Sequence, residues 1–244
     1  MALAGATKMN LIFTMAGRYS RFINEGYKIP KYLLPWGKRS ILSEILSIMN
    51  HNNTFENIYL VTNKRDDIYM PHVRQILREL NIPIENLFQI DDTKGQAETA
   101  YITINKIHDR LNKKPVVFHN IDTILYNREY SSISEILKKK DGHIDVFKSN
   151  NQAYSYVLVE NNNVQAMAEK VVMSGLATSG LYAFKNTQIF LENYRDEFIY
   201  ISEVYQHMID NNMVIGVGRL YDEHDTVVLG TPEQYLNSSY LIDL

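Results

Sequence analysis

Cysteine is absent from the 244 residues, which excludes disulfide bridges, thiol catalysis and cysteine-bound zinc. A cytoplasmic protein is the simplest expectation from that absence. An excess of basic residues is also missing, because 25 lysines and arginines face 28 acidic residues, for a net charge of −3. A nucleic-acid partner usually requires a basic face, so none is expected. No apolar run approaches the roughly 18 residues of a membrane-spanning helix, so no membrane contact is expected either.

The first eight residues lack the apolar core of a signal peptide, so nothing in them directs export. Because Met9 directly precedes the first strand-like run, residues 1–8 are interpreted as a leader, a cloning remnant or a frayed terminus. The remaining chain has no repeat, linker or low-complexity tract, and 45% of the sequence is hydrophobic. We therefore expect a single domain over residues 9–244, made of two halves, 9–142 and 143–244.

The first half of the chain alternates strand-like and helix-like segments. Strands are expected at 10–16, 58–62, 87–90 and 116–121, and helices at 40–49, 66–80 and 97–111. This order predicts an α/β fold with a Rossmann-like, mostly parallel sheet flanked by helices. Such sheets bind ligands beyond the carboxyl ends of their strands, which directs attention to the loops after Met15, Ile90 and Ile121.

The second half consists mainly of short alternating runs that polar turns separate. Strands are expected at 144–149, 154–159, 164–167 and 180–184, most of them antiparallel. Helices are expected at 202–209 and 232–241, the second opened by Thr231 as N-cap and Pro232 as first helical residue. This half is thus predicted to be rich in strands.

A basic loop with small residues follows the first strand directly. Small residues let backbone N–H groups approach phosphate oxygens, arginine offers a planar fork to them, and lysine offers a point charge. Charge alone favours a solvated surface loop, whereas the position after a strand favours a phosphate-binding loop. The residues concerned are Ala16, Gly17, Arg18, Arg21, Lys28 and Lys31.

The order of these residues resembles the N-terminal signature of the sugar-phosphate nucleotidyltransferases, or nucleoside-diphosphate-sugar pyrophosphorylases. That signature is a Gly-x-Gly-x-Arg loop followed by Pro-Lys, and the spacer from Arg21 to Lys31 resembles a branch associated with capsule and surface-polysaccharide pathways. The resemblance implies that Arg21 contacts a triphosphate and that Lys31 bridges the nucleotide and an acceptor phosphate. Tyr19 stands where the second glycine is expected, so its side chain would crowd the nucleotide or stack on it.

Two further segments extend the resemblance on the nucleotide side. Gly95 and Gln96 are similar to the family's loop near the nucleotide base, although a plain helix N-terminus would look the same. Asn120 and Asp122 follow a strand where the family holds its magnesium aspartate, although a turn residue often stands there too. The implied nucleotide-binding residues are Ala16, Gly17, Arg18, Tyr19, Arg21, Lys31, Gly95, Gln96 and Asn120, and the implied cofactor is Mg²⁺, with Mn²⁺ as a substitute.

The resemblance makes residues 9–142 the nucleotide-binding half and residues 143–244 the acceptor-binding half. The second half carries two more matches to the family. Glu169-Lys170 and Ser179-Gly180 are similar to the family's acceptor-binding segment, although an exposed Glu-Lys pair is also ordinary surface chemistry. Many relatives hold a second metal aspartate at the position of Val228, for which Asp225 or Asp222 could substitute. The implied metal ligands are therefore Asp122 and Asp225.

These residues predict an enzyme that joins a nucleoside monophosphate from an NTP to a small phosphorylated acceptor and releases pyrophosphate. The acceptor phosphate is already anionic, so alignment and charge neutralisation matter more than a general base. Lys31, Arg21 and Asp122 are the predicted catalytic residues. An amide such as that of Gln96 can donate and accept together, which favours CTP or UTP. Sugar 1-phosphates, phosphorylated alcohols and amino-acid derivatives stay open as acceptors, as does assembly into a homo-oligomer.

Two other function classes compete with this interpretation. A nucleotide-sugar glycosyltransferase of related fold would need an Asp-x-Asp motif, and Asn120-Ile121-Asp122 lacks one of the two acids. A non-catalytic nucleotide-binding module would accommodate the unexpected Tyr19 and Val228. The seven histidines show no paired metal-binding spacing, and His119 is interpreted as structural.

Overall fold

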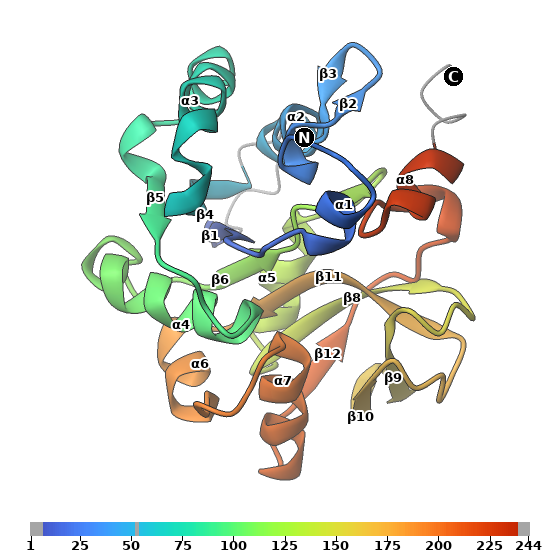
Figure 1. Cartoon of the computed structure of the whole chain (residues 1–244). Coiled ribbons are helices and arrows are strands. Elements are labelled where there is room, and N and C mark those ends of the chain that lie inside the picture. The colour runs from blue at the N-terminus through green and yellow to red at the C-terminus, as the bar shows by residue number, and fades with distance from the viewer. Residues whose placement is uncertain (1–6, 52–53, 239–244) are drawn as a thin grey trace.

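The computed structural model describes residues 7–51 and 54–238, arranged around a nine-stranded sheet (Figure 1). The strands follow the spatial order β5-β4-β1-β6-β11-β8-β12-β10-β9. Strands from both halves of the sequence therefore share one sheet. Residues 1–6 of the expected leader and residues 239–241 of the last expected helix lie outside the described residues.

The first four main strands are parallel, as predicted. They are β1 (Met9–Met15), β4 (Phe55–Asn63), β5 (Leu87–Ile90) and β6 (Val116–His119). Leu11 and Phe13 of β1 pack in one apolar cluster with α2 (Ile41–Asn50) and α3 (Met70–Glu79). Ile12 packs in another cluster with α4 (Gln96–Ile107) on the opposite face. Because helices cover both faces, this part of the sheet is buried on both sides.

The second half of the chain extends the sheet mainly with antiparallel strands. β11 (Leu176–Phe184) runs antiparallel to both β6 and β8 (Gly142–Lys148), while β9 (Ser155–Glu160) and β10 (Asn163–Glu169) form a hairpin. β12 (Ile215–Val217) is parallel to β8 and was not predicted. The predicted mixed α/β class is confirmed. The remaining helices of this half are α5 (Ser131–Leu137), α6 (Thr187–Asn193), α7 (Ile201–Asp210) and α8 (Pro232–Asn237).

The helix expected over residues 66–80 is divided in the structure. A 3₁₀ helix, η2 (Lys64–Tyr69), opens with the Asn63 side chain accepting a hydrogen bond from the Arg65 N–H, and α3 begins only at Met70. Pro71 explains the division, because it lacks the N–H that a continuous helix would need at this point and is tolerated only in a first turn.

Two small antiparallel pairs supplement the main sheet. β2 (Pro35–Trp36) pairs with β3 (Arg39–Ser40), and β7 (Thr123–Leu125) pairs with β13 (Thr226–Val228). The second pair brings the end of the chain beside the turn that follows β6. The short helices are α1 (Ser20–Asn24), η1 (Lys31–Leu33), η3 (Ile84–Asn86), η4 (His108–Arg110) and η5 (Glu223–Asp225). Among the helices of the described ranges, none has the length and apolarity that crossing a bilayer demands.

Candidate active site

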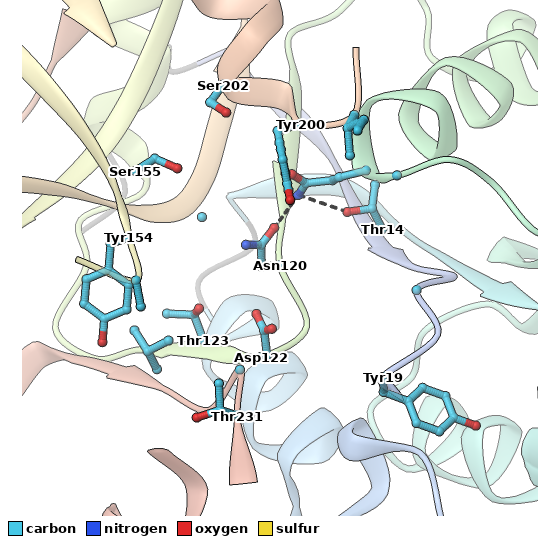
Figure 2. A pocket seen from close by; sticks show the side chains of 18 of the residues that line it. Thr14, Tyr19, Asn120, Asp122, Thr123, Tyr154, Ser155, Tyr200, Ser202 and Thr231 are labelled. Atoms are coloured by element: carbon cyan, nitrogen blue, oxygen red, sulfur yellow. Dashed lines mark hydrogen bonds between the residues drawn. The ribbon is translucent and has the colours of Figure 1, made fainter. Parts of the chain in front are cut away.

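A cavity of about 710 Å³ opens where the loop after β1, the turn after β6, the end of β10 and the middle of β11 converge (Figure 2). This volume is typical of a small-molecule site. Of the residues that the sequence singled out for this site, all line the cavity except Lys28, Asp222 and Asp225. The lining members of that set are Ala16, Gly17, Arg18, Tyr19, Arg21, Lys31, Gly95, Gln96, Asn120, Asp122, Glu169, Lys170, Ser179 and Gly180.

The basic loop enters the cavity through a left-handed residue. Tyr19 has φ 38° and ψ 35°, a backbone conformation that favours the glycine expected there. Its hydroxyl donates a 2.8 Å hydrogen bond to Oδ1 of Asp66, and its ring points away from Asp122 (Figure 2). Burial and the Asp66 carboxylate raise the pKa of the Tyr19 phenol, so the phenol remains a donor. The side chain is thus directed toward η2, away from the centre of the cavity.

Asp122 lies in the turn between β6 and β7, beside the segment that follows β13. Its backbone oxygen accepts a 2.7 Å hydrogen bond from the Leu229 N–H, and a Cβ at Gly230 would lie 3.3 Å from its Oδ2. Lys31 Nζ lies 2.5 Å from the same Oδ2. Burial opposes ionisation of Asp122, but the Lys31 ammonium outweighs it and lowers the pKa of the carboxyl below its ordinary value. The Asp122 carboxylate is therefore held in its ionised form beside Lys31.

A buried arginine, Arg128, is hydrogen-bonded to β13, the strand that pairs with β7. Arg128 donates to Thr226 Oγ1 at 2.6 Å and to the Asp225 backbone oxygen at 2.7 Å, and it pairs with Asp145 at 3.2 Å. Its guanidinium carbon lies 3.8 Å from the ring centroid of Tyr221. Burial raises the pKa of Asp145 even though Arg128 opposes the shift. The cluster joins the segment after β7 to β8 and β13.

The donor set fits a magnesium ion carried by a nucleotide, with one carboxylate from the protein. Asp225 is placed apart from Asp122, because its Oδ1 accepts a 2.7 Å hydrogen bond from Asn127 and it is not among the cavity-lining residues. Val228 occupies the nearer position, opposite Thr123 in the β7–β13 pair. Three-carboxylate or histidine clusters are absent from the described residues. The structure therefore does not place Asp225 where a second ligand would be needed. One carboxylate is sufficient, because magnesium needs only one or two when phosphates and water complete its octahedron.

Two glycines allow the close approach of segments around Gln96 and Asn120. A Cβ at Gly95 would lie 2.4 Å from the Ile199 backbone oxygen, and a Cβ at Gly180 would lie 2.5 Å from Asn120 Nδ2. Gln96 Nε2 donates to Thr14 Oγ1 at 3.2 Å and also to Asn120 Oδ1, as the dashed lines in Figure 2 show. The amide nitrogen of Gln96 is therefore engaged by the protein, which leaves its oxygen as the group it offers to a ligand.

The cavity wall around Glu169 and Lys170, where the sequence predicts acceptor binding, is called the acceptor-side wall. It contains hydroxyl groups that the sequence did not single out. Glu169 Oε2 accepts a hydrogen bond from Ser155 Oγ and another, at 3.1 Å, from Ser202 Oγ. Ser155 comes from β9, and Ser202 comes from the first turn of α7. Tyr200, the N-cap of α7, also lines the cavity, and its ring centroid is 5.7 Å from Lys170 Nζ. Their ordinary positions within a strand and a helix start gave no motif by which to find them.

Comparison with known proteins agrees with this arrangement. Residues 15–217 match the family model described as nucleotidyl transferase. A nucleoside-diphosphate-sugar pyrophosphorylase from Vibrio cholerae RC9 has the same fold with a TM-score of 0.81 at 24% identity, over 94% of this chain and 99% of that one. The inositol-1-phosphate CTP transferase from T. maritima has a TM-score of 0.73 at 14% identity, over 99% of this chain and 97% of that one. No curated protein matches the chain.

The family match covers most of the chain, from the end of β1 to β12, and includes all the cavity segments up to α7. It confirms the resemblance drawn from the loop after β1, and with it the prediction of an enzyme rather than a binding module. It also decides against the glycosyltransferase. The chain belongs to the nucleotidyl transferase family and is a nucleotidyltransferase.

Proposed function

We propose that the protein transfers a nucleoside monophosphate from an NTP to a small phosphorylated acceptor, with Mg²⁺ as cofactor. An oxygen of the acceptor phosphate attacks the α-phosphorus, a new P–O–P bond forms, and the bond to the leaving pyrophosphate breaks. The observation that carries the proposal is the contact of Lys31 with Asp122, at 2.5 Å, between the basic loop and the acceptor-side wall. This is the point at which two phosphate groups would meet.

The reaction needs no protein nucleophile, because the acceptor phosphate is itself one. The residues instead align two mutually repelling anions and neutralise their charge. Lys31 would lie between the donor and acceptor phosphates, and Arg21 would bind the outer phosphates of the NTP. Glu169 and Lys170 would hold the acceptor. In this assignment residues 9–142 supply most nucleotide contacts and residues 143–244 supply most acceptor contacts.

Asp122 would hold the magnesium ion, which supplies positive charge to the α-phosphate when bound. The Lys31 ammonium would then leave the carboxylate for the phosphate oxygens. The space at Gly230, where a Cβ would come within 3.3 Å of Asp122 Oδ2, supports this assignment. A larger residue at position 230 would fill the space beside the carboxylate.

We further propose a pyrimidine nucleotide, CTP or UTP. Because Thr14 and Asn120 engage the Gln96 amide nitrogen, its oxygen is free to accept a hydrogen bond from the base. The cytosine amino group and the uracil N3–H both offer such a donor. The name of the T. maritima relative specifies CTP for that protein. A Gln96→Ala variant should discriminate less among NTPs while losing little of its best rate.

The test is a pyrophosphate-release screen of four NTPs against sugar 1-phosphates, phosphorylated alcohols and phosphorylated amino-acid derivatives. Release should require both substrates together and should depend on Mg²⁺ or Mn²⁺. A product that contains the nucleoside monophosphate joined to the acceptor phosphate would identify the reaction by mass. Release without any acceptor, or none with any acceptor, would contradict the proposal. The resemblance to the capsule-associated branch supports a product that serves surface-polysaccharide assembly.

A further inference from the structure

The acceptor-side wall contains the carboxylate of Glu169, which lines the cavity. Among the described residues, Glu169 forms no ion pair with a lysine, arginine or histidine. Its hydrogen bonds within that part of the chain come from Ser155 and Ser202, and both reach Oε2. Two hydroxyls therefore fix the orientation of the carboxylate without changing its charge, and Oε1 remains for a ligand.

The neighbouring lysine is turned to a different partner. Lys170 has φ 56°, and its backbone N–H donates to the Tyr154 oxygen at 3.1 Å, so the chain bends directly after Glu169. The bend carries the Lys170 ammonium to the face of Tyr200, 5.7 Å from the ring centroid. An adjacent Glu-Lys pair that could have neutralised itself is thus kept apart. The cavity presents one anion and one cation at separate places.

Tyrosines line the same cavity as this carboxylate. Tyr154, Tyr182 and Tyr200 all line the cavity (Tyr154 and Tyr200 are labelled in Figure 2). Burial, with the nearby Glu169 carboxylate, raises the pKa of Tyr182, which therefore adds no negative charge of its own. Aromatic faces attract cations and favour an ammonium that has lost part of its hydration. A fixed carboxylate beside the neutral Tyr182 ring, in a cavity that two further tyrosines line, has the features of a site for an organic cation.

We propose that Glu169 binds an ammonium group of the acceptor, so that the acceptor is a small phosphate ester carrying a positive charge. This inference rests on the proposed function, since it names the substrate class of the same reaction. The acceptor phosphate would lie toward Lys31 and Lys170, and its ammonium would lie at Glu169 among the tyrosines. The two ends of such an acceptor match the two separated charges of the wall. A primary amine and a quaternary amine share this chemistry.

Matched acceptor pairs separate the charge of the acceptor from its shape. Phosphocholine is compared with 3,3-dimethylbutyl phosphate, its neutral isostere, and O-phosphoethanolamine is compared with 2-hydroxyethyl phosphate. Glucose 1-phosphate and glucosamine 1-phosphate form a third pair. With the best NTP, kcat/KM should be at least about tenfold higher for the charged member of a pair, the scale of a desolvated cation–π and charge contact. The first two pairs also show whether a quaternary or a primary amine is preferred.

A variant assigns the preference to Glu169. Glu169→Gln keeps the shape and the hydroxyl contacts but removes the charge, so the charged-to-neutral ratio should fall to within about twofold of one. Glu160→Gln is the matched control, because Glu160 is exposed at the far end of β9 and its change should leave the ratio intact. Circular dichroism and the unfolding midpoint should be unchanged in both variants.

The outcomes distinguish this inference from the proposed function. Transfer to neutral isosteres or to glucose 1-phosphate at equal efficiency overturns the ammonium site and leaves nucleotidyl transfer to a phosphorylated acceptor standing. A ratio that survives Glu169→Gln also overturns it. Failure of every acceptor with every NTP overturns both proposals together. A charged-member preference that only Glu169→Gln abolishes supports the site.

Discussion

The ammonium nitrogen of Lys31 lies 2.5 Å from Oδ2 of Asp122, although the two residues are 91 positions apart in the sequence. Their side chains are 20% and 19% exposed, so the pair borders the cavity without being fully solvated. The pair joins the loop after β1 to the turn after β6. In the proposed reaction, the cation that would bridge the phosphates and the carboxylate that would hold the metal therefore start in contact.

Asp122→Asn should lower turnover by at least about 100-fold, which corresponds to about 2.7 kcal/mol of transition-state stabilisation. The amide keeps the size of the side chain but loses the charge that, in the proposed function, would hold Mg²⁺. Pyrophosphate release at saturating substrates measures the effect. Asp225→Asn is the control and should stay within about twofold, because Asp225 contacts Asn127 outside the cavity lining. Full activity of Asp122→Asn, or of the unaltered enzyme in excess chelator, would remove Asp122 from the mechanism.

Lys31 and Lys170 should differ in which kinetic constant they control. Pro30 precedes Lys31 and stiffens the segment, so the ammonium can bridge two phosphates as charge moves to the leaving pyrophosphate. Lys31→Ala should therefore lower kcat by about 100-fold or more. Lys170→Ala should mainly raise the acceptor KM, because the proposed contact of Lys170 with the acceptor would be the same before and during the reaction. Steady-state kinetics with each substrate varied in turn measures both.

Lys31→Arg tests the bridging role more sharply than removal does. The guanidinium keeps the positive charge, but its planar fork is larger than an ammonium and does not fit the same point between two phosphates. We expect kcat to fall nearly as far as in Lys31→Ala. If Lys31→Arg retains the kcat of the unaltered enzyme, Lys31 contributes charge alone.

Local sequence signals were sufficient for the parallel half and for most of the cavity. Each loop there follows a buried strand, and the carboxyl ends of parallel strands meet at one edge, so Lys31, Gln96 and Asp122 were expected together. The role of Tyr19 could not be predicted in this way. Its direction depends on Asp66, 47 residues further along the chain, which accepts its hydroxyl. A long-range partner of this kind leaves no local pattern.

The acceptor-side wall shows a second limit of prediction from the sequence. Counting outward from the β9–β10 turn, where Asn163 pairs with Glu160, would place Tyr154 opposite Glu169. The register shifts by one residue between Val164 and Ala166, so Ser155 takes that place and donates to Glu169. A β-bulge reverses which side chains share a face, and the sequence gives little warning of one. The position of Asp225 outside the cavity lining could not be predicted for a related reason, since the β7–β13 pairing was not foreseen.

His143 should make the stability of the protein depend on pH. Burial lowers its pKa to about 4, although a hydrogen bond with the Gly216 backbone partly opposes the shift. In the unfolded chain the imidazole titrates near its ordinary value of 6.5. Between pH 6.5 and about 4 the unfolded state therefore binds the proton and the folded state does not, so stability falls as the pH falls. The full contribution of this residue is about 3 kcal/mol.

Urea unfolding at pH 7, 5.5 and 4.5 measures this dependence. A His143→Leu variant should show a shallower loss of stability on acidification than the unaltered protein. His108→Asn is the control, because the His108 side chain is 54% exposed and its change should preserve the slope. An identical slope in His143→Leu would mean that His143 is solvated or protonated in the fold.

Asp66 should keep the basic loop of residues 17–31 ordered, because it accepts hydrogen bonds from tyrosines at both ends of that loop. Tyr19 donates to Oδ1 at 2.8 Å, and Tyr32 donates to Oδ2 at 3.0 Å. In Asp66→Asn only one carbonyl oxygen remains for two phenols, and a buried donor left without a partner costs about 1–3 kcal/mol. We expect that loss in the free energy of unfolding, together with faster amide exchange over residues 17–31.

Ligand binding should oppose this loosening if the loop encloses the triphosphate. Most residues between the two tyrosines are exposed, although Phe22 is buried, and their basic residues outnumber the single Glu25. The exposed amides should therefore exchange rapidly in the free protein and more slowly with NTP and Mg²⁺. In Asp66→Asn the ligand-induced slowing should be larger, since more order remains to be gained, and the NTP affinity should fall accordingly. Asp67→Asn, an exposed neighbour on η2, should match the unaltered protein in both measurements. Equal exchange over residues 17–31 with and without NTP would show that the loop does not enclose the nucleotide, whatever the effect of Asp66 on stability.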